Sequence, residues 1–214
     1  MLNLTPSLLI SYLFVLLTAF SVHEFAHAWT ANFFGDETPR LNGRLTLNPL
    51  AHLDPLGSLM MLVAGFGWAK PVPVNPYALE RRSSAALMLV SLAGPISNFL
   101  MAFLAALPFR LGLVSVYQAQ VDMMSSSSHF LPTLPQLLWV FVSVNLVLML
   151  FNLIPLYPLD GEKIAIYFLP PSWGRALERI RPISPLILLA LVFVGGLSLI
   201  ITPVLTGLTR LLVG

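Results

Sequence analysis

The hydrophobic positions of this sequence gather into four long segments, separated by shorter polar stretches. The segments cover roughly residues 7–31, 84–109, 135–156 and 184–213. Each is long enough to cross a bilayer, because a helix rises 1.5 Å per residue and the hydrocarbon core is about 30 Å thick. The pattern therefore predicts an all-α polytopic membrane protein with about four to five transmembrane helices. Glycines and a proline within 184–213 leave open whether that segment forms one span or two.

A shorter apolar stretch, residues 55–69, does not fit this pattern. Three glycines interrupt it, and the proline-rich KPVPVNP follows. Its length and these breakers favour a re-entrant or interfacial segment over a full span. The preceding residues 41–50 carry Asn42–Gly43 and then an alternating RLTLN, which is typical of a short hairpin. We therefore expect a short membrane re-entrant β-hairpin or loop after the first helix, with an ordinary irregular loop over 41–76 as the alternative.

Composition supports the membrane assignment. Hydrophobic residues make up 57% of the chain and charged residues only 9%, whereas soluble proteins carry about a quarter charged residues. Basic residues do not interleave with aromatic ones in a patch, so no nucleic-acid partner is expected. The sequence has no cysteine, which excludes disulfides, thiolate metal ligands and cysteine nucleophiles. The N-terminal MLNLTPS lacks a basic region, so we do not expect a removable signal peptide.

The basic residues predict how the chain is oriented in the membrane. If the first helix runs from outside to inside and 55–69 does not cross the membrane, segments 32–83 and 157–183 face the cytoplasm. These segments hold nine of the eleven basic residues, and only Arg110 and Arg210 lie outside. Cytoplasmic loops of membrane proteins are enriched in Lys and Arg, so this orientation is favoured over its inverse.

One motif places ionisable residues inside the first apolar segment. The sequence SVHEFAHAW contains His23, Glu24 and His27. Positions i and i+4 share one face of a helix, so both imidazoles can bind the same metal ion, with Glu24 beside them. Ionisable side chains within a membrane span are rare and usually functional. The H-E-x-x-H pattern therefore predicts a zinc site with an adjacent general base, and a structural cluster of satisfied polar groups is the alternative.

A catalytic zinc site needs a third protein ligand and an open position for water. In a chain without cysteine, the candidates are His52, Asp54, Asp160 and Glu162. Asp160 is favoured because it follows the apolar helix 135–156, which two prolines bring to an end. In the predicted orientation, that end and the two histidines both lie toward the cytoplasm, so they can meet at one depth.

Two further motifs make the pattern specific. The later apolar segment closes with NLIPLYPLDG, residues 152–161, and GPISN, residues 94–98, lies between. The chain order is HEFAH, GPISN and then NLIPLYPLDG. These motifs in this order resemble the site-2 protease family of M50-type intramembrane zinc metalloproteases, which pairs H-E-x-x-H with N-x-x-P-x-x-x-L-D-G. The resemblance covers roughly residues 7–165. Over these residues the sequence looks like the compact form of the family, without a PDZ or CBS domain.

The resemblance implies the roles of the site residues. It assigns His23, His27 and Asp160 as ligands of one Zn²⁺ per chain. It assigns Glu24 as the general base that activates water and later protonates the leaving amine. It also suggests Asn152 as a catalytic donor to the oxyanion, with a helix-packing or capping amide as the alternative for that residue.

The implied function is hydrolysis of peptide bonds within or near transmembrane segments, as in regulated intramembrane proteolysis. The substrates would be transmembrane proteins or membrane peptides, in a prokaryotic inner membrane with the active site toward the cytoplasm. We expect residues 1–214 to form a single membrane-embedded metalloprotease domain, with its core at 7–165 and an amphipathic and transmembrane segment at 166–214. Because substrate helices must unwind, a strand edge from 41–50 or 70–76 is predicted to pair with them by β-addition.

Two other functions would use the same polar cluster. A membrane ion or metal transporter would need ionisable groups at several depths along a path, whereas these gather at one depth. A non-proteolytic membrane binding partner would not need Glu24 together with all three ligands. The sequence does not select the substrate, the trigger or the oligomeric state.

Several other polar or small residues have competing interpretations. His52 and Asp54 are either a gate or contact near the zinc or, as Asp-Pro turns favour, parts of an ordinary loop. Glu162 is expected at a solvated helix start. Gly94 and Pro95 are expected at a close-packing and kink site between helices.

Overall fold

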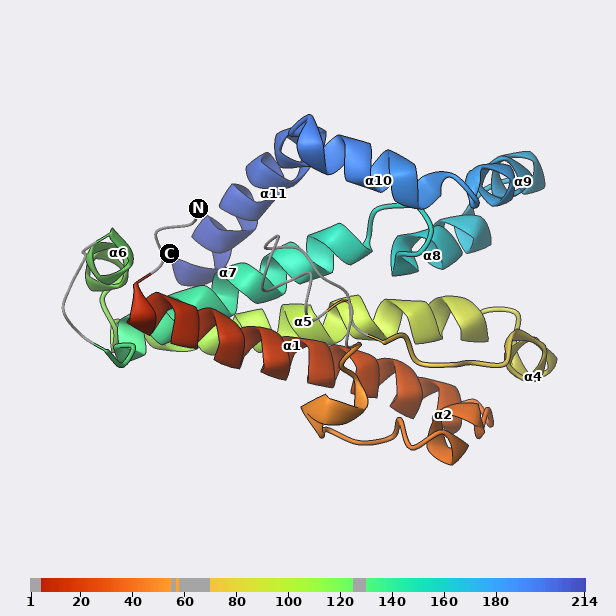
Figure 1. The fold of residues 1–214 in the computed structure, drawn as a ribbon, viewed down its shortest axis with the longest axis horizontal. Helices are drawn as coiled ribbons and strands as arrows, with labels where there is room; N and C mark the ends of the chain where they lie inside the picture. The colour runs from red at the N-terminus through yellow and green to blue at the C-terminus, as the bar shows by residue number, and fades with distance from the viewer. Residues whose placement is uncertain (1–4, 55–56, 58–69, 125–129) are drawn as a thin grey trace. The chain divides into compact units, whose positions relative to one another are not determined.

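The computed structural model describes residues 5–54, 57, 70–124 and 130–214. These residues are 75% helical and contain no strand, and Figure 1 shows the helices in chain order. Four helices are long and apolar enough to cross a membrane: α1 (Pro6–Phe33), α5 (Ala86–Arg110), α7 (Leu134–Asn152) and α11 (Gly196–Val213). The prediction of an all-α polytopic membrane protein is therefore confirmed.

Shorter elements connect the long helices. They are α2 (Thr38–Leu41), the 3₁₀ turn η1 (Pro49–Ala51), α4 (Pro76–Arg82), α6 (Val116–Met124), α8 (Asp160–Phe168), α9 (Pro171–Ile180) and α10 (Ser184–Phe193). The predicted last segment is split into α10 and α11 at Gly195. The φ of this glycine is 74°, which is left-handed and therefore interrupts a right-handed helix. The predicted re-entrant segment 55–69 lies outside the described residues, apart from Gly57.

The hairpin predicted for residues 41–50 is wrong. All ten of these residues are described, and they form the end of α2, a turn, an irregular stretch and the start of η1. Local capping explains the difference: the side chain of Asn48 accepts a hydrogen bond from the Leu50 N–H at 3.1 Å, which starts η1 at Pro49. The alternative prediction of an irregular loop fits residues 41–50. These residues therefore offer no strand edge to which a substrate could add by β-addition.

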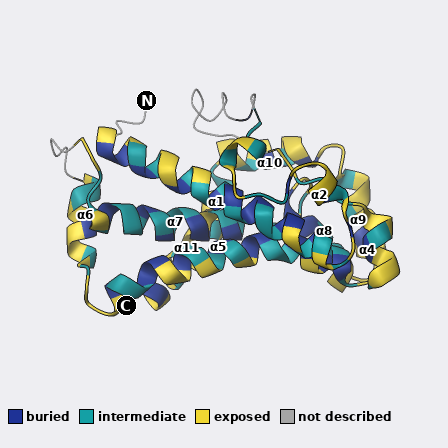
Figure 2. Cartoon of the chain, turned by 90° about the horizontal axis from the view of Figure 1, so that it is seen from below, coloured by how far each residue is buried: buried dark blue, intermediate teal, exposed yellow. Residues whose placement is uncertain are grey.

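The chain folds into two compact units. The first contains Met1–Ala19, Asn98–Phe151 and Leu189–Gly214, and the second contains Phe20–Ser97 and Asn152–Leu188. Buried and exposed residues alternate along the long helices, as the colours of Figure 2 show. Such alternation is what a helix shows when one side packs on protein and the other faces a different medium.

In the first unit, some polar groups are buried and several large apolar groups are exposed. Asn98 of α5 donates a hydrogen bond of 2.9 Å to the amide oxygen of Asn145 on α7, and both residues are fully buried. Phe14 on α1 and Leu104 on α5 are by contrast 54% and 62% exposed. This distribution suits lipid, in which exposed apolar side chains carry no penalty and polar side chains need partners between helices.

In the second unit, α8 packs against α9 (Figure 1), and a partly buried ion pair links α8 to the residue that follows α9. Glu162, in the first turn of α8, has a side chain that is 2% exposed and accepts a 2.7 Å bond from the Arg181 guanidinium. The expectation that Glu162 lies in a solvated helix start is therefore wrong. A carboxylate can be buried here because Arg181, just after α9, supplies the opposite charge.

We predict that Arg181→Ala lowers the free energy of unfolding by about 1–3 kcal/mol, because it leaves a buried carboxylate without its charged partner. The guanidinium is 44% exposed, so the effect stays below that of a fully buried pair. Thermal unfolding in detergent would measure it, with the exposed Arg179→Ala as the control. Adding Glu162→Gln to Arg181→Ala should restore part of the loss, and an unchanged melting temperature in Arg181→Ala would contradict the prediction.

Candidate metal centre

The three polar residues of HEFAH lie on α1, within the second unit. His23, Glu24 and His27 are 5%, 9% and 7% exposed, so all three side chains are buried. The helical spacing places both imidazoles on the same side of α1, as the sequence predicted. Burying them in an apolar helix carries a desolvation cost, which partners must offset.

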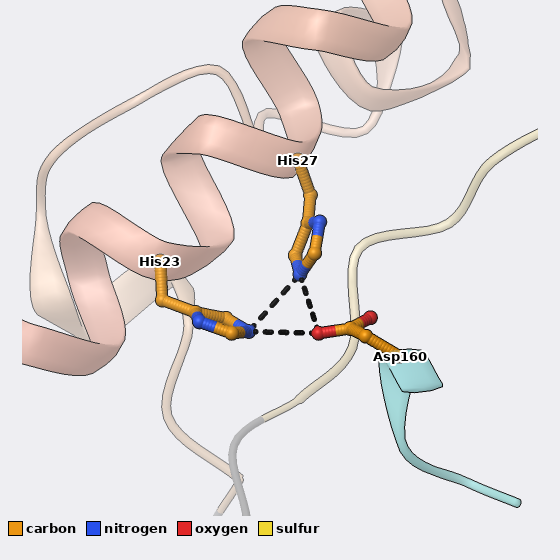
Figure 3. Close-up of side chains that lie close together, drawn as sticks. All are labelled: His23, His27 and Asp160. Carbon is orange, nitrogen blue, oxygen red and sulfur yellow. Dashed lines mark hydrogen bonds and ion pairs between the residues drawn. The ribbon is translucent and has the colours of Figure 1, made fainter. Parts of the chain in front are cut away.

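The partner of the two histidines is Asp160, the first residue of α8 (Figure 3). The Nε2 atoms of His23 and His27 lie 3.0 Å apart, and the Asp160 Oδ2 lies 3.3 Å from the first and 3.2 Å from the second. These residues form a group of possible metal ligands in the described part of the chain. The structure thus brings together the three residues that the sequence predicted as ligands.

The spacing of these atoms fits a tetrahedral zinc site. Zinc binds histidine nitrogen and carboxylate oxygen at about 2.0–2.2 Å, so tetrahedral ligand atoms lie roughly 3.3 Å from one another. The observed separations are 3.0–3.3 Å. The donor set of two imidazoles and one carboxylate also leaves a fourth position open, as catalytic zinc sites require.

The ionisation of Asp160 suits a metal ligand. Burial alone would raise the pKa of this carboxyl group, but the charge of His27 and hydrogen bonds from both histidines lower its pKa well below the usual range. The carboxylate is therefore charged at neutral pH, which is the form that binds metal ions.

A backbone carbonyl on α5 orients the imidazole of His27. Its Nδ1–H donates to the carbonyl oxygen of Val90 at 2.7 Å, since a carbonyl can only accept. This bond keeps the proton on Nδ1, so Nε2 is the atom that would offer its lone pair to a metal ion once its own proton is lost. Metal-binding histidines in proteins are usually held in this way.

The same helix approaches both histidines at Gly94, which lies in the GPISN motif. A Cβ atom on Gly94 would lie 2.6 Å from Cε1 and Nε2 of His23 and would collide with Nε2 of His27. Only glycine lets the α5 backbone come this close to the candidate ligand atoms. The predicted close-packing site at Gly94 is thus confirmed, and its neighbours are the two histidines.

The remaining residue of the motif, Glu24, has its own partner. Its Oε2 accepts a hydrogen bond of 3.2 Å from the backbone N–H of Val72. Val72 belongs to the proline-rich stretch that precedes α4. Glu24 is therefore held separately from the three possible metal ligands.

Comparison with known proteins is consistent with this geometry. A sequence profile of peptidase family M50 matches residues 11–195. The chain belongs to this family. It is 45% identical over 171 residues to "Putative zinc metalloprotease YwhC" of Bacillus subtilis, covering 80% of this chain and 73% of that protein.

More distant M50 relatives share the same kind of name. The chain is 31% identical over 198 residues to "Putative zinc metalloprotease Rip2" of Mycobacterium tuberculosis, covering 89% of this chain and 66% of the relative. Rip2 of Mycolicibacterium smegmatis is also 31% identical, over 189 residues. No solved structure gives a significant match. Membership in M50 and these names identify zinc as the metal that the cluster would hold.

The second M50 motif, NLIPLYPLDG, explains how Asp160 reaches the site. Helix α7 ends at Asn152, and prolines 155 and 158 keep the next residues out of a helix until α8 begins. Gly161 then packs so closely that a Cβ would collide with the carbonyl oxygens of Leu153 and Ile154. The turn therefore requires glycine immediately after the aspartate. Asn152 is half-buried at the end of α7, and its proposed contact with the oxyanion stays a prediction.

Two other ligand candidates of this M50 chain, His52 and Asp54, lie in a loop and outside the cluster. His52 is 1% exposed and its Nε2–H donates to the Thr46 carbonyl oxygen at 2.8 Å. Asp54 accepts a 2.8 Å bond from the N–H of Gly57, as a capping residue does. The interpretation of both residues as loop structure is favoured over a place at the metal.

Proposed function

We propose that this M50 chain is an intramembrane zinc metalloprotease, with His23, His27 and Asp160 as the ligands of one zinc ion. The observation that carries the proposal is the approach of three ligand atoms, from two different helices, to the spacing of a tetrahedral zinc site. The zinc metalloprotease names of the relatives support it. Glu24 is proposed as the catalytic base.

The mechanism follows from where these side chains lie. Bound zinc would lower the pKa of water toward about 7 and polarise the substrate carbonyl. The Glu24 carboxylate takes the proton of the attacking water and delivers it to the leaving amine. The His27 ring keeps one orientation throughout, because its Nδ1–H stays bonded to Val90. Asn152 is proposed as a hydrogen-bond donor to the oxyanion.

The proposed substrates are transmembrane proteins or membrane peptides. The two histidines lie on α1, a helix apolar enough to span the membrane, which favours peptides that come from or enter the bilayer as substrates. We propose one membrane-embedded metalloprotease domain with its active site toward the cytoplasm, as the basic residues suggest. The bacterial origin of the relatives supports a prokaryotic cell (inner) membrane. Regulated intramembrane proteolysis is proposed as the role, because the chain belongs to the M50 family and has helices that could span a membrane.

The proposal is tested by metal content and cleavage in purified protein. The wild type should hold one zinc per chain and cleave a model transmembrane substrate, with cleavage lost on chelation and restored by zinc. Asp160→Ala should lose zinc affinity by more than 100-fold, since partners that only orient ligands are worth about 10–100-fold. The exposed Glu80→Ala is the matched control. A wild type without zinc, or an Asp160→Ala that keeps both zinc and cleavage, would refute the assignment.

A further inference from the structure

An extended segment runs past Glu24 in the second unit. Residues Lys70–Asn75, here called the strap, precede α4 and have no helical structure. Its sequence, KPVPVN, places prolines on both sides of Val72. Prolines lack an N–H and hold the residues before them in extended conformations. The central part of the strap is thus stiff, and within Pro71–Pro73 only Val72 has a backbone N–H to donate.

The first end of the strap is anchored to the loop before it. The Lys70 N–H donates to the His52 carbonyl oxygen at 2.8 Å. The Lys70 carbonyl oxygen accepts a 3.2 Å bond from the Arg44 guanidinium, which also donates to Ala51 at 2.6 Å. Arg44 is only 5% exposed. A buried guanidinium therefore fixes where the strap begins.

The second end of the strap is anchored by Asp36, which follows α1. Its Oδ2 accepts a 2.6 Å bond from the Asn75 N–H, and its Oδ1 accepts a 3.0 Å bond from the Thr38 N–H. Asp36 is 2% exposed. A buried carboxylate with two backbone donors makes strong, charge-assisted bonds. The mechanism proposed above gives this buried acid no role.

The middle of the strap reaches the proposed base. Between the two anchors, the Val72 N–H donates to the Glu24 Oε2 at 3.2 Å. Glu24 lies on α1 and Asp36 lies just after it, so both ends of this connection start from one helix. The bond occupies one carboxylate oxygen of Glu24 and restricts the rotation of the carboxylate.

We propose that Asp36 is a positioning residue for Glu24. It fixes the Asn75 end of the strap, the strap carries the Val72 N–H, and that N–H holds the carboxylate in the orientation that proton transfer needs. The inference rests on the proposed function, because it gives Glu24 the role of base. Proton transfer depends strongly on position, so a strap that shifts should slow chemistry without releasing the metal.

Asp36→Asn tests the anchor. It keeps the size of the side chain but removes the charge that holds the Asn75 N–H. We expect kcat to fall about 10- to 100-fold, with KM and zinc content unchanged. The control is Glu37→Gln, the adjacent acid, which pairs with Arg40 at the surface and should match the wild type. Equal kcat in Asp36→Asn and wild type would overturn the proposal.

Substitution of Val72 tests the connection itself. Val72→Pro removes the N–H and suits an extended backbone between two prolines, whereas Val72→Ala keeps the N–H. The ratio of kcat between these two variants measures the hydrogen bond, and we expect at least a tenfold difference. If Asp36 acts through this bond, Asp36→Asn should lower kcat no further in the Val72→Pro background. Additive losses would assign Asp36 a general structural role instead.

Hydrogen exchange separates this inference from the proposed function. In the full chain in detergent, the Val72 amide should be protected, and Asp36→Asn but not Glu37→Gln should speed its exchange. If the wild type lacks both zinc and cleavage, the proposed protease function is refuted. Hydrogen exchange at the Val72 amide then still tests whether Asp36 holds the strap in place. A wild type that cleaves, with Val72→Pro equal to Val72→Ala, refutes the inference alone. Unprotected Val72 in the wild type also refutes it.

Discussion

Glu24→Gln is expected to keep zinc at the wild-type level and to lose cleavage of a transmembrane substrate. The three possible ligands do not include Glu24, so the metal should stay bound. The amide of glutamine has nearly the size of the carboxylate, and its oxygen can still accept the Val72 N–H. It cannot take a proton from water. General-base catalysis contributes about 10²–10⁴-fold, and cleavage should fall by at least that much.

The measurement compares zinc content with cleavage in the same preparations of wild type and Glu24→Gln. Glu80→Gln, on the exposed side of α4, controls for the loss of an acidic residue. Retained zinc with lost cleavage distinguishes a protease from an ion transporter or a binding partner, for which the base has no role. Wild-type cleavage in Glu24→Gln would show that another group activates the water.

Gly94→Ala is expected to release zinc from a chain that still folds. The added methyl group would lie 2.6 Å from Nε2 of His23 and closer to Nε2 of His27, which are the candidate ligand atoms. Either the imidazoles rotate or α5 moves away, and overpacking of this kind costs about 1–3 kcal/mol of stability. Zinc affinity should fall at least 10- to 100-fold, the range seen when partners that orient ligands are lost. Cleavage should fall with it.

The chain offers a matched control for this substitution. Gly207 lies within α11, and a Cβ there would meet no atom within 4 Å. Gly207→Ala should therefore keep zinc and cleavage, and should raise helix stability by roughly 0.5–1 kcal/mol. Metal analysis and thermal unfolding of both variants would measure whether only Gly94→Ala lowers zinc binding. Full zinc occupancy in Gly94→Ala would mean that α5 does not press on the histidines as described.

The long helices could be predicted because lipid demands a simple pattern. An apolar run of sufficient length is nearly enough to identify a span, and α1, α5 and α7 begin or end within a few residues of the predicted limits. The predicted hairpin at 41–50 failed for the opposite reason. Its alternation covered few residues, and the cap at Asn48 decided the local structure.

The candidate ligands could also be predicted, because their chemistry is carried by side chains with recognisable spacing. The groups that surround these ligands could not be predicted from the sequence. Val90 and Val72 act through backbone atoms, which every residue has. Asp36 binds the backbone of Asn75, which is 39 residues away along the chain. Arg181 meets Glu162 only because α8 and α9 pack together. No local pattern in a single sequence marks such long-range partners.

The order of the site residues along the chain has a consequence for biogenesis. HEFAH enters the membrane with α1, Val90 follows His27 by 63 residues, and Asp160 is made later still. At synthesis rates of about 5–20 residues per second, the histidines wait roughly 7–30 s for their third partner. A ribosome-bound chain that ends before α8 therefore carries an incomplete site. The proposed zinc site is completed only after Asp160 has been made.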